Sequence, residues 1–223
     1  MQACTLEPMV AETVPAAQRA YESTKEQILS GELPGGTLLS EADIADRLAV
    51  SRTPVHEAFL RLEGEELLRL IPRRGAVVVP VSPGEALDIL EIRVALESAA
   101  VRRLAAGGWD LSDLTNRLAA LTREQAEYCE ARDITGFART DAAFHRAIVT
   151  ASGNAIADRF YASLSDRQRR MTIGAVATRP DRLALLVREH QGLARCINDR
   201  DPDGFTGALT RHLEATHSFL FAR

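Results

Sequence analysis

Side chains suited to binding a divalent metal ion are concentrated in the second half of the chain, where four of the five histidines lie. Asp141 and His145 are four residues apart, so on a helix both project from one face and could hold one ion together. His190 and His212 could each add an imidazole from a further helix. Three imidazoles and a carboxylate suit Zn²⁺, Ni²⁺, Mn²⁺ or Fe²⁺. Spacing alone also fits ordinary surface histidines or hydrogen-bonded core histidines.

A second group of side chains that could bind a ligand consists of arginines in the first third of the chain. If Val55, Ala58, Phe59 and Leu62 form the buried face of one helix, its outward positions are residues 52, 53, 56, 57 and 61. Arginine can read guanine with two hydrogen bonds, and threonine can contact the backbone or a thymine methyl group. The basic turn formed by residues 72–75 could neutralise phosphates or enter a minor groove.

The composition sets limits on these chemistries. With 27 basic and 31 acidic residues the net charge is −4, so no overall positive field attracts nucleic acid or an anionic membrane. Apolar runs such as residues 76–80 are far shorter than the roughly 18 residues that a membrane helix needs. We therefore expect a cytoplasmic protein that does not contact membranes. The three cysteines form no CxxC pair and are expected to be reduced thiols.

The elements that must position the arginines are short. Residues 1–14 show no sustained period and are expected to form a mobile arm. Apolar spacing predicts a helix over 16–30 and a second over 41–49 capped by Ser40, with a third capped by Ser51 or Thr53. Apolar runs at 67–71 and 76–79 around the basic turn predict a β-hairpin. The break at residues 80–84 is the expected domain boundary.

The stretch that carries the metal-type ligands contains only helical patterns. Breaks rich in Gly, Asn, Asp and Pro divide it into about six segments, and about six helices over this length imply a bundle. The fold class is therefore mainly α, with an N-terminal helix-turn-helix and hairpin before an all-α bundle. The expected helices cover residues 84–106, 111–131, 134–151, 155–178, 180–199 and 202–221.

Two short helices followed by a hairpin are typical of a winged helix-turn-helix, whose second helix enters the major groove. Residues 1–80 hold eight basic and twelve acidic residues, which argues against DNA binding. Six of the eight bases nevertheless lie in the helix-turn-helix and wing, so the charge could be polarised toward one face. From spacing alone, a winged helix that binds protein is an equal alternative.

Particular residues narrow this choice. The runs that match are Leu39-Ser40-Glu41, Ile44-Ala45-Asp46-Arg47-Leu48, Val50-Ser51-Arg52-Thr53-Pro54-Val55, Glu57-Ala58, Leu60-Arg61-Leu62-Glu63 and Arg74-Gly75-Ala76-Val77-Val78-Val79. Together they resemble the GntR family of bacterial transcription regulators. The chain departs from it at His56, where the family usually has arginine, and at Gly64-Glu65-Glu66-Leu67, where the glycine usually precedes the leucine directly. The resemblance implies a DNA-binding domain over residues 15–80, with contacts from Arg47, Ser51, Arg52, Thr53, His56, Arg61, Arg73, Arg74 and Gly75.

The remaining residues, 81–223, resemble the helical FCD effector domain of the FadR branch of that family. The matching runs are Leu90-Glu91-Ile92-Arg93-Val94-Ala95-Leu96-Glu97, Asp141-Ala142-Ala143-Phe144-His145, Ser152-Gly153-Asn154, Glu189-His190 and Arg211-His212-Leu213. The resemblance implies that Asp141, His145, His190 and His212 bind a divalent metal, and that Arg93 meets the carboxylate of a small effector. It also implies dimerisation through this domain, and six helices would suggest the VanR-like subgroup.

The leading interpretation is a homodimeric repressor that binds a palindromic double-stranded DNA operator and responds to an organic acid. A metal-sensing regulator and a metal-dependent helical-bundle enzyme fused to a DNA-binding module are the alternatives. Against an enzyme, there is no second carboxylate set, and Glu189 is expected to face away from the ligands. Arg93 could instead simply pair with Glu97, His217 is expected on the surface, and the run Arg167–Arg170 is expected to be a solvated helix face or a dimer rim.

Overall fold

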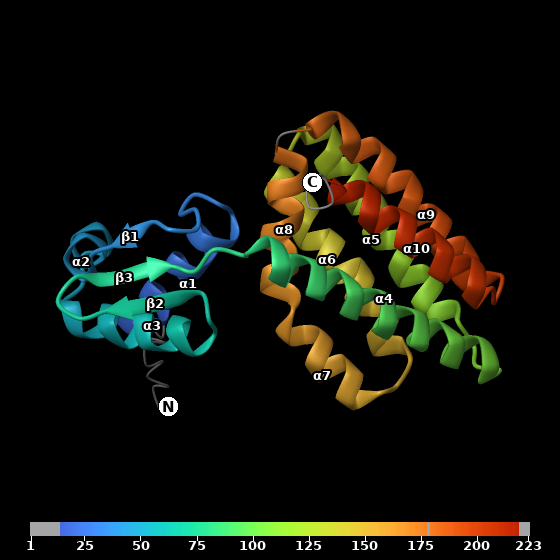
Figure 1. Cartoon of the computed structure of the whole chain (residues 1–223), viewed down its shortest axis with the longest axis horizontal. Coiled ribbons are helices and arrows are strands. Elements are labelled where there is room, and N and C mark those ends of the chain that lie inside the picture. The colour runs from blue at the N-terminus through green and yellow to red at the C-terminus, as the bar shows by residue number, and fades with distance from the viewer. Residues whose placement is uncertain (1–13, 178, 219–223) are drawn as a thin grey trace, which may run out of the picture. The chain divides into compact units, whose positions relative to one another are not determined.

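The computed structural model describes residues 14–177 and 179–218 (Figure 1). The chain divides into two compact units, one holding residues up to Ile28 together with Leu33–Val79, the other holding Leu29–Glu32 and the chain from Pro80 onward. The mobile arm expected over residues 1–14 lies, apart from Val14, outside the described residues.

Three helices build the N-terminal unit as the sequence predicts: α1 (Ala16–Leu29), α2 (Glu41–Leu48) and α3 (Arg52–Gly64). Ser40 caps α2, because its side chain accepts hydrogen bonds from the amides of Ala42 and Asp43. Ser51 occupies the N-cap position of α3, although its side chain makes no capping bond there. Only residues 49–51 separate α2 from α3, so the turn that joins the end of α2 to the start of α3 is short.

The predicted inner face of α3 is confirmed, since Val55, Ala58, Phe59 and Leu62 are all fully buried. Burying four apolar side chains on one side fixes the rotation of the helix about its axis. The opposite side of α3, with its polar residues, is left to solvent.

The hairpin is also present, with β2 (Leu68–Ile71) antiparallel to β3 (Gly75–Val78). A third strand, β1 (Leu38–Leu39), pairs with the other edge of β3 and gives the order β1-β3-β2. Strand β1 was not predicted from the sequence, because two residues are too few to show an alternating pattern. Gly75 has φ +99°, and a Cβ there would lie 2.0 Å from the backbone oxygen of Leu39. Only glycine lets β1 approach β3 this closely.

The second unit is an all-helical bundle, as expected. Its helices are α4 (Pro83–Ala106), α5 (Ser112–Ala131), α6 (Ile134–Ala151), α7 (Ala155–Ser163), α8 (Ser165–Ala177), the 3-10 turn η1 (Pro180–Arg182), α9 (Leu183–Asn198) and α10 (Pro202–Thr216). The single helix predicted over 155–178 is two helices separated at Leu164. The described part of this unit thus has seven α-helices, and the VanR-like subgroup inferred from six loses that support.

Helix α6 lies at the centre of the bundle and packs against α4, α5, α7 and α8, while α9 packs against α5 and α10 (Figure 1). Its buried residues lie on several sides, for example Gly136, Asp141 and Ala142. A polar side chain on one of these sides is enclosed by the bundle and needs polar partners there. In the part of the chain that the structure describes, no helix combines the length and apolar character needed to cross a bilayer.

Gly75→Ala should destabilise the N-terminal unit, because the new Cβ would overlap the Leu39 carbonyl and also occupy an unfavourable φ. Gly36→Ala is the matched control, since Gly36 has φ +87° but a Cβ there would meet no atom within 4 Å. We expect Gly36→Ala to cost about 1–2 kcal/mol and Gly75→Ala clearly more. Hydrogen exchange of the β3 amides in the whole chain measures both. Equal protection in the two variants would contradict the close approach.

Candidate functional site

The four predicted metal ligands come together inside the bundle. Asp141 and His145 project from α6, His190 from α9 and His212 from α10, and one candidate ligand atom of each lies within 4.8 Å of all the others. All four side chains are buried. The three imidazole centroids lie 4.8–5.4 Å from one another. The helix spacing of Asp141 and His145 thus does place them on one side, facing two further helices.

Each imidazole is held through its Nδ1 atom by a residue of a neighbouring element. The acceptor oxygens are Glu97 Oε2 for His145 at 2.7 Å, Gln125 Oε1 for His190 at 2.8 Å, and Glu189 Oε2 for His212 at 2.8 Å. An ionised carboxylate only accepts hydrogen bonds, so Nδ1 of His145 and of His212 carries the proton. In a neutral ring the Nε2 atom then has a free lone pair, which is the state that binds a metal.

Burial keeps two of these rings neutral. It lowers the pKa of His145 although Glu97 acts in the opposite direction, and it lowers the pKa of His212 to about 4 against the effect of Glu189. Burial alone would raise the pKa of Asp141, but the adjacent His190 and His145 rings and the Arg93 guanidinium outweigh it and lower this pKa far below its usual range. The cluster therefore offers neutral imidazoles beside an ionised carboxylate.

The atoms facing one another inside the cluster are mainly acceptors. Nε2 of His190 lies 3.3 Å from Asp141 Oδ1, and Nε2 of His145 lies 3.9 Å from the same oxygen. Both Nε2 atoms are buried without a hydrogen-bond partner. Lone pairs that face a carboxylate oxygen repel it unless a cation lies between them. Ligand bonds of about 2.0–2.2 Å allow opposite ligand atoms to be about 4 Å apart, so the set fits one transition-metal ion after a small contraction.

A buried charged group adjoins this cluster. Arg93 on α4 donates from Nε to Glu97 Oε1 at 3.2 Å, so the expected i to i+4 pairing is present. Tyr161 on α7 donates to the same oxygen at 2.6 Å. Burial lowers the pKa of Arg93, but Tyr161 and Glu97 outweigh it and hold the pKa above its ordinary value. The guanidinium is therefore a permanent buried cation.

Some buried polar atoms near these groups have no hydrogen-bond partner. In residues 14–177 and 179–218, neither Arg93 Nη2 nor either amide atom of Gln168 has a hydrogen-bond partner. Gln168 lies one helical turn before Thr172 on α8, and Thr172 donates to Asp141 Oδ2 at 3.1 Å. Buried polar atoms are normally paired, so unpaired ones indicate where a polar ligand can bind.

Three expectations about this unit are wrong. Glu189 does not face away from the ligands, because it accepts the Nδ1 proton of His212. His217 is not on the surface: α10 ends at Thr216, and the His217 side chain folds in to 1% exposure. The run Arg167–Arg170 is not a fully solvated face, since its arginines are half-buried and Gln168 is buried, while its alternative role as a dimer rim stays a prediction.

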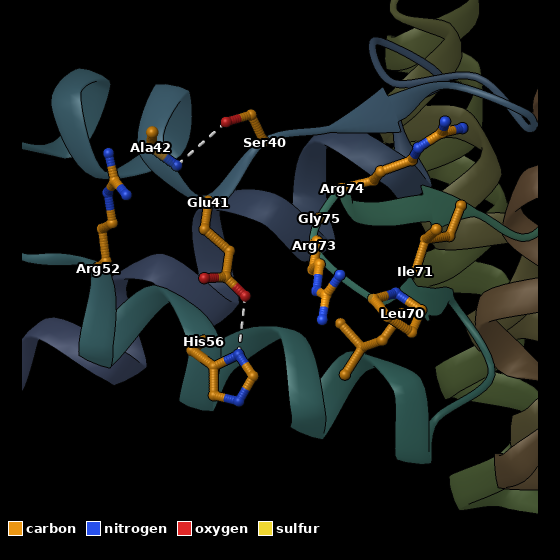
Figure 2. A pocket seen from close by; sticks show the side chains of 11 residues that line it. Ser40, Glu41, Ala42, Arg52, His56, Leu70, Ile71, Arg73, Arg74 and Gly75 are labelled. Carbon is orange, nitrogen blue, oxygen red and sulfur yellow. Dashed lines mark hydrogen bonds and ion pairs between the residues drawn. The ribbon is translucent and has the colours of Figure 1, made fainter.

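The N-terminal unit has a groove of about 550 Å³ formed by α2, α3 and the hairpin turn, shown in Figure 2. Of the predicted DNA contacts, it brings together Arg52, His56, Arg73, Arg74 and Gly75. The four side chains among them are exposed. Figure 2 shows the guanidinium groups of Arg73 and Arg74 leaving the turn in different directions. The remaining lining residues are Ser40, Glu41, Ala42, Leu70, Ile71 and Pro72.

The other predicted DNA contacts do not line this groove. Arg47, Ser51 and Thr53 are exposed. Arg61 is also exposed, but its guanidinium lies 3.8 Å from the centroid of the Tyr21 ring and donates to Gln18 Oε1 at 2.8 Å. Arg61 therefore connects α3 to α1.

One groove residue was not anticipated from the sequence. Glu41, the first residue of α2, accepts a hydrogen bond at 2.7 Å from Nδ1 of His56 on α3. The carboxylates and amide that hold the three buried imidazoles were equally missed as a group, namely Glu97, Gln125 and Glu189. Only Glu97 carried a signal, its i+4 spacing from Arg93, and all three lie far along the chain from the histidines that they hold.

Comparison with known proteins gives consistent matches to both units. Residues 16–78 match the family model described as bacterial regulatory proteins, gntR family, and residues 88–215 match the FCD domain model. The solved structure titled E. coli McbR/YncC superposes with a TM-score of 0.74 at 24% identity, covering 94% of this chain and 98% of the other. That likeness concerns the fold.

Curated relatives extend the comparison. The HTH-type transcriptional repressor RspR of Escherichia coli K12 is 29% identical and aligns over 94% of this chain and 91% of its own length. A probable D-xylose utilization operon transcriptional repressor of Paenarthrobacter nicotinovorans is 31% identical, over 85% and 81% respectively. The gluconate operon transcriptional repressor of Bacillus subtilis is 34% identical over 59% of this chain and 53% of its own.

The buried His217 predicts a pH dependence of stability. Burial is the main reason that its pKa falls to about 3, whereas an unfolded chain has a histidine pKa of about 6.5. Its contribution to stability is complete above about pH 6.5 and is lost, at about 1.4 kcal/mol per unit, as the pH falls toward 3. His217→Gln should flatten the fall in unfolding free energy between pH 6.5 and 4.5 in urea titrations. Parallel pH profiles for the two proteins would show that His217 is not buried in its neutral form.

Proposed function

Since the chain belongs to the GntR family of bacterial regulatory proteins and carries an FCD domain, it is a DNA-binding transcriptional regulator and not an enzyme. We propose that it is a repressor controlled by a small carboxylate bound beside a divalent metal ion. The repressor names of several relatives support the direction of control. The observation that carries the proposal is the set of inward-facing, unpaired Nε2 atoms around Asp141.

We assign operator binding to residues 15–80 as a DNA-binding domain. The exposed side of α3 and the turn between β2 and β3 hold the cations, so α3 would enter a major groove while the turn contacts the flanking backbone. A homodimer on a palindromic operator would place two such units on successive half-sites. The proposed contacts remain Arg47, Ser51, Arg52, Thr53, His56, Arg61, Arg73, Arg74 and Gly75. Of these, Arg61 and Gly75 act mainly by maintaining the structure of the domain.

We assign effector binding and dimerisation to residues 81–223. Asp141, His145, His190 and His212 would hold Zn²⁺, Ni²⁺, Mn²⁺ or Fe²⁺, and the bound ion would supply a positive charge and open coordination positions. The acceptors of the three Nδ1 protons orient the rings for this role.

Arg93 is the proposed anchor of the effector carboxylate. It is buried and permanently charged, and its Nη2 has no hydrogen-bond partner among the residues that the structure describes. A guanidinium with a free donor next to a cationic centre is well suited to a carboxylate. The effector changes operator affinity only by as much as its own affinity differs between the two states of the dimer.

If Arg52 reads bases and Arg74 contacts the DNA backbone, replacing each by alanine should affect operator binding differently. Arg52→Ala should cost about 1–3 kcal/mol of operator affinity and relax base preference, whereas Arg74→Ala should weaken all duplexes alike and reduce the salt slope by about 1. Titration of operator and scrambled duplexes at several salt concentrations measures both. If Arg52→Ala changed neither affinity nor preference, α3 would not be the reading helix.

The metal assignment predicts close to one divalent ion per chain in gently purified protein. His212→Ala should lose most of it, and a chelator should lower the melting temperature of the wild type but hardly that of the variant. Glu214→Ala, an exposed change on the same helix, is the control. Glu189→Ala, which removes only the support of His212, should weaken metal binding about 10–100-fold.

The same proteins distinguish control by a carboxylate from control by the metal ion itself. His212→Ala should still bind operator but should no longer respond to a carboxylate, for which gluconate is a reasonable first probe. Metal alone releasing wild-type protein from operator would make the ion itself the signal. Wild type without metal, together with an unchanged response in His212→Ala, would reduce the cluster to core histidines.

A further inference from the structure

The His56–Glu41 pair is a polar contact at the entrance of α3 that the proposed function does not yet use. Glu41 stands at the first position of α2, where the Ser40 cap fixes the start of the helix. His56 lies on α3, one turn after Arg52. The Nδ1 and Oε1 atoms are 2.7 Å apart, and the pair joins the two helices across the groove (Figure 2).

This contact determines which atoms of the ring remain available. The Glu41 carboxylate can only accept, so Nδ1 of His56 must donate to it. In the uncharged ring, Nε2 is then an acceptor. His56 is half exposed, and in the described residues no hydrogen bond occupies its Nε2 atom. Figure 2 shows this side of the ring turned away from Glu41.

An acceptor and a cation read different bases in a major groove. Arginine selects guanine, which presents the two acceptors N7 and O6, whereas the donors in the groove are the amino groups adenine N6 and cytosine N4. A ring fixed as an acceptor therefore matches adenine or cytosine. A neutral ring free to exchange its tautomer would show no such preference.

The negative charge of Glu41 is a second reason why its carboxylate needs a partner within the protein. It is the one carboxylate among the groove-lining residues, which otherwise include Arg52, Arg73 and Arg74. A free carboxylate there would repel DNA phosphates. The Glu41 carboxylate instead accepts a hydrogen bond from His56 within the protein.

We propose that Glu41 is a positioning residue that fixes His56 as a hydrogen-bond acceptor, and that His56 thereby reads the amino group of an adenine or cytosine at one position of each operator half-site. The proposal rests on the DNA-binding role proposed above for α3.

The test begins with selection of duplexes from a randomised pool by the full-length protein at about pH 8. Wild type should enrich adenine or cytosine at one position per half-site. Loss of one hydrogen bond is worth about three- to tenfold in affinity. Replacing the selected base by its analogue lacking the amino group, purine for adenine or 2-pyrimidinone for cytosine, should therefore weaken wild-type binding by about that factor.

Three variants complete the experiment. Glu41→Ala and His56→Phe should bind the normal and the analogue duplex within about twofold of one another, a difference smaller than one hydrogen bond. Asp46→Asn removes one exposed negative charge from the same helix without touching the pair, and it should keep the full discrimination. Glu41→Ala should lose the base preference but still bind DNA, which a merely structural role of Glu41 does not predict.

Two results would overturn the inference. Wild-type enrichment of guanine or thymine at the position lost in His56→Phe would mean that the ring donates instead of accepting. Retention of full discrimination by Glu41→Ala would mean that Glu41 does not set the tautomer. Failure of the wild type to bind any duplex would instead contradict the DNA-binding role itself, so the two failures are distinguishable.

Discussion

Every imidazole in the ligand cluster has its Nδ1 committed to a neighbouring acceptor, and the remaining polar groups of the site must be satisfied around that arrangement. Meeting this requirement draws on every α-helix of the second unit. Arg93 and Glu97 come from α4, Gln125 from α5, Asp141 and His145 from α6, Tyr161 from α7, Thr172 from α8, Glu189 and His190 from α9, and His212 from α10. The site is consequently a property of the whole bundle, and a change of charge at its centre reaches every helix.

The N-terminal unit has to expose cations to DNA although the net charge of the chain is −4. The apolar face of α3 fixes which side is outward, and the close approach at Gly75 holds the turn that carries Arg73 and Arg74. The acidic residues are thereby kept out of the groove, with the exception of Glu41, which is hydrogen-bonded to His56. Local placement of charge accounts for an interface that the overall composition argues against.

Periodicity and short motifs predicted the parts of the structure that depend on neighbouring residues. The inner face of α3 and the convergence of Asp141 with His145 follow from helix geometry. What depends on distant or weak signals was missed. Glu97 and Gln125 lie 48 and 65 residues from the histidines that they hold. The break at Leu164 contains neither glycine nor proline, and His217 was misplaced because the helix was extended past Thr216.

The depth of the ligand cluster also has a kinetic consequence. The side chains of Asp141, His145 and His190 are at most 5% exposed, and Phe144 stacks on the His190 ring with centroids 4.6 Å apart. An ion held there would leave only when part of the bundle opens, so its residence time would follow the rate of local unfolding. A carboxylate bound to Arg93 would meet the same barrier, because that side chain is also buried. On the time scale of rotamer and loop motions, such an ion would therefore be a fixed component, and the rate at which the bundle opens would limit how quickly transcription responds.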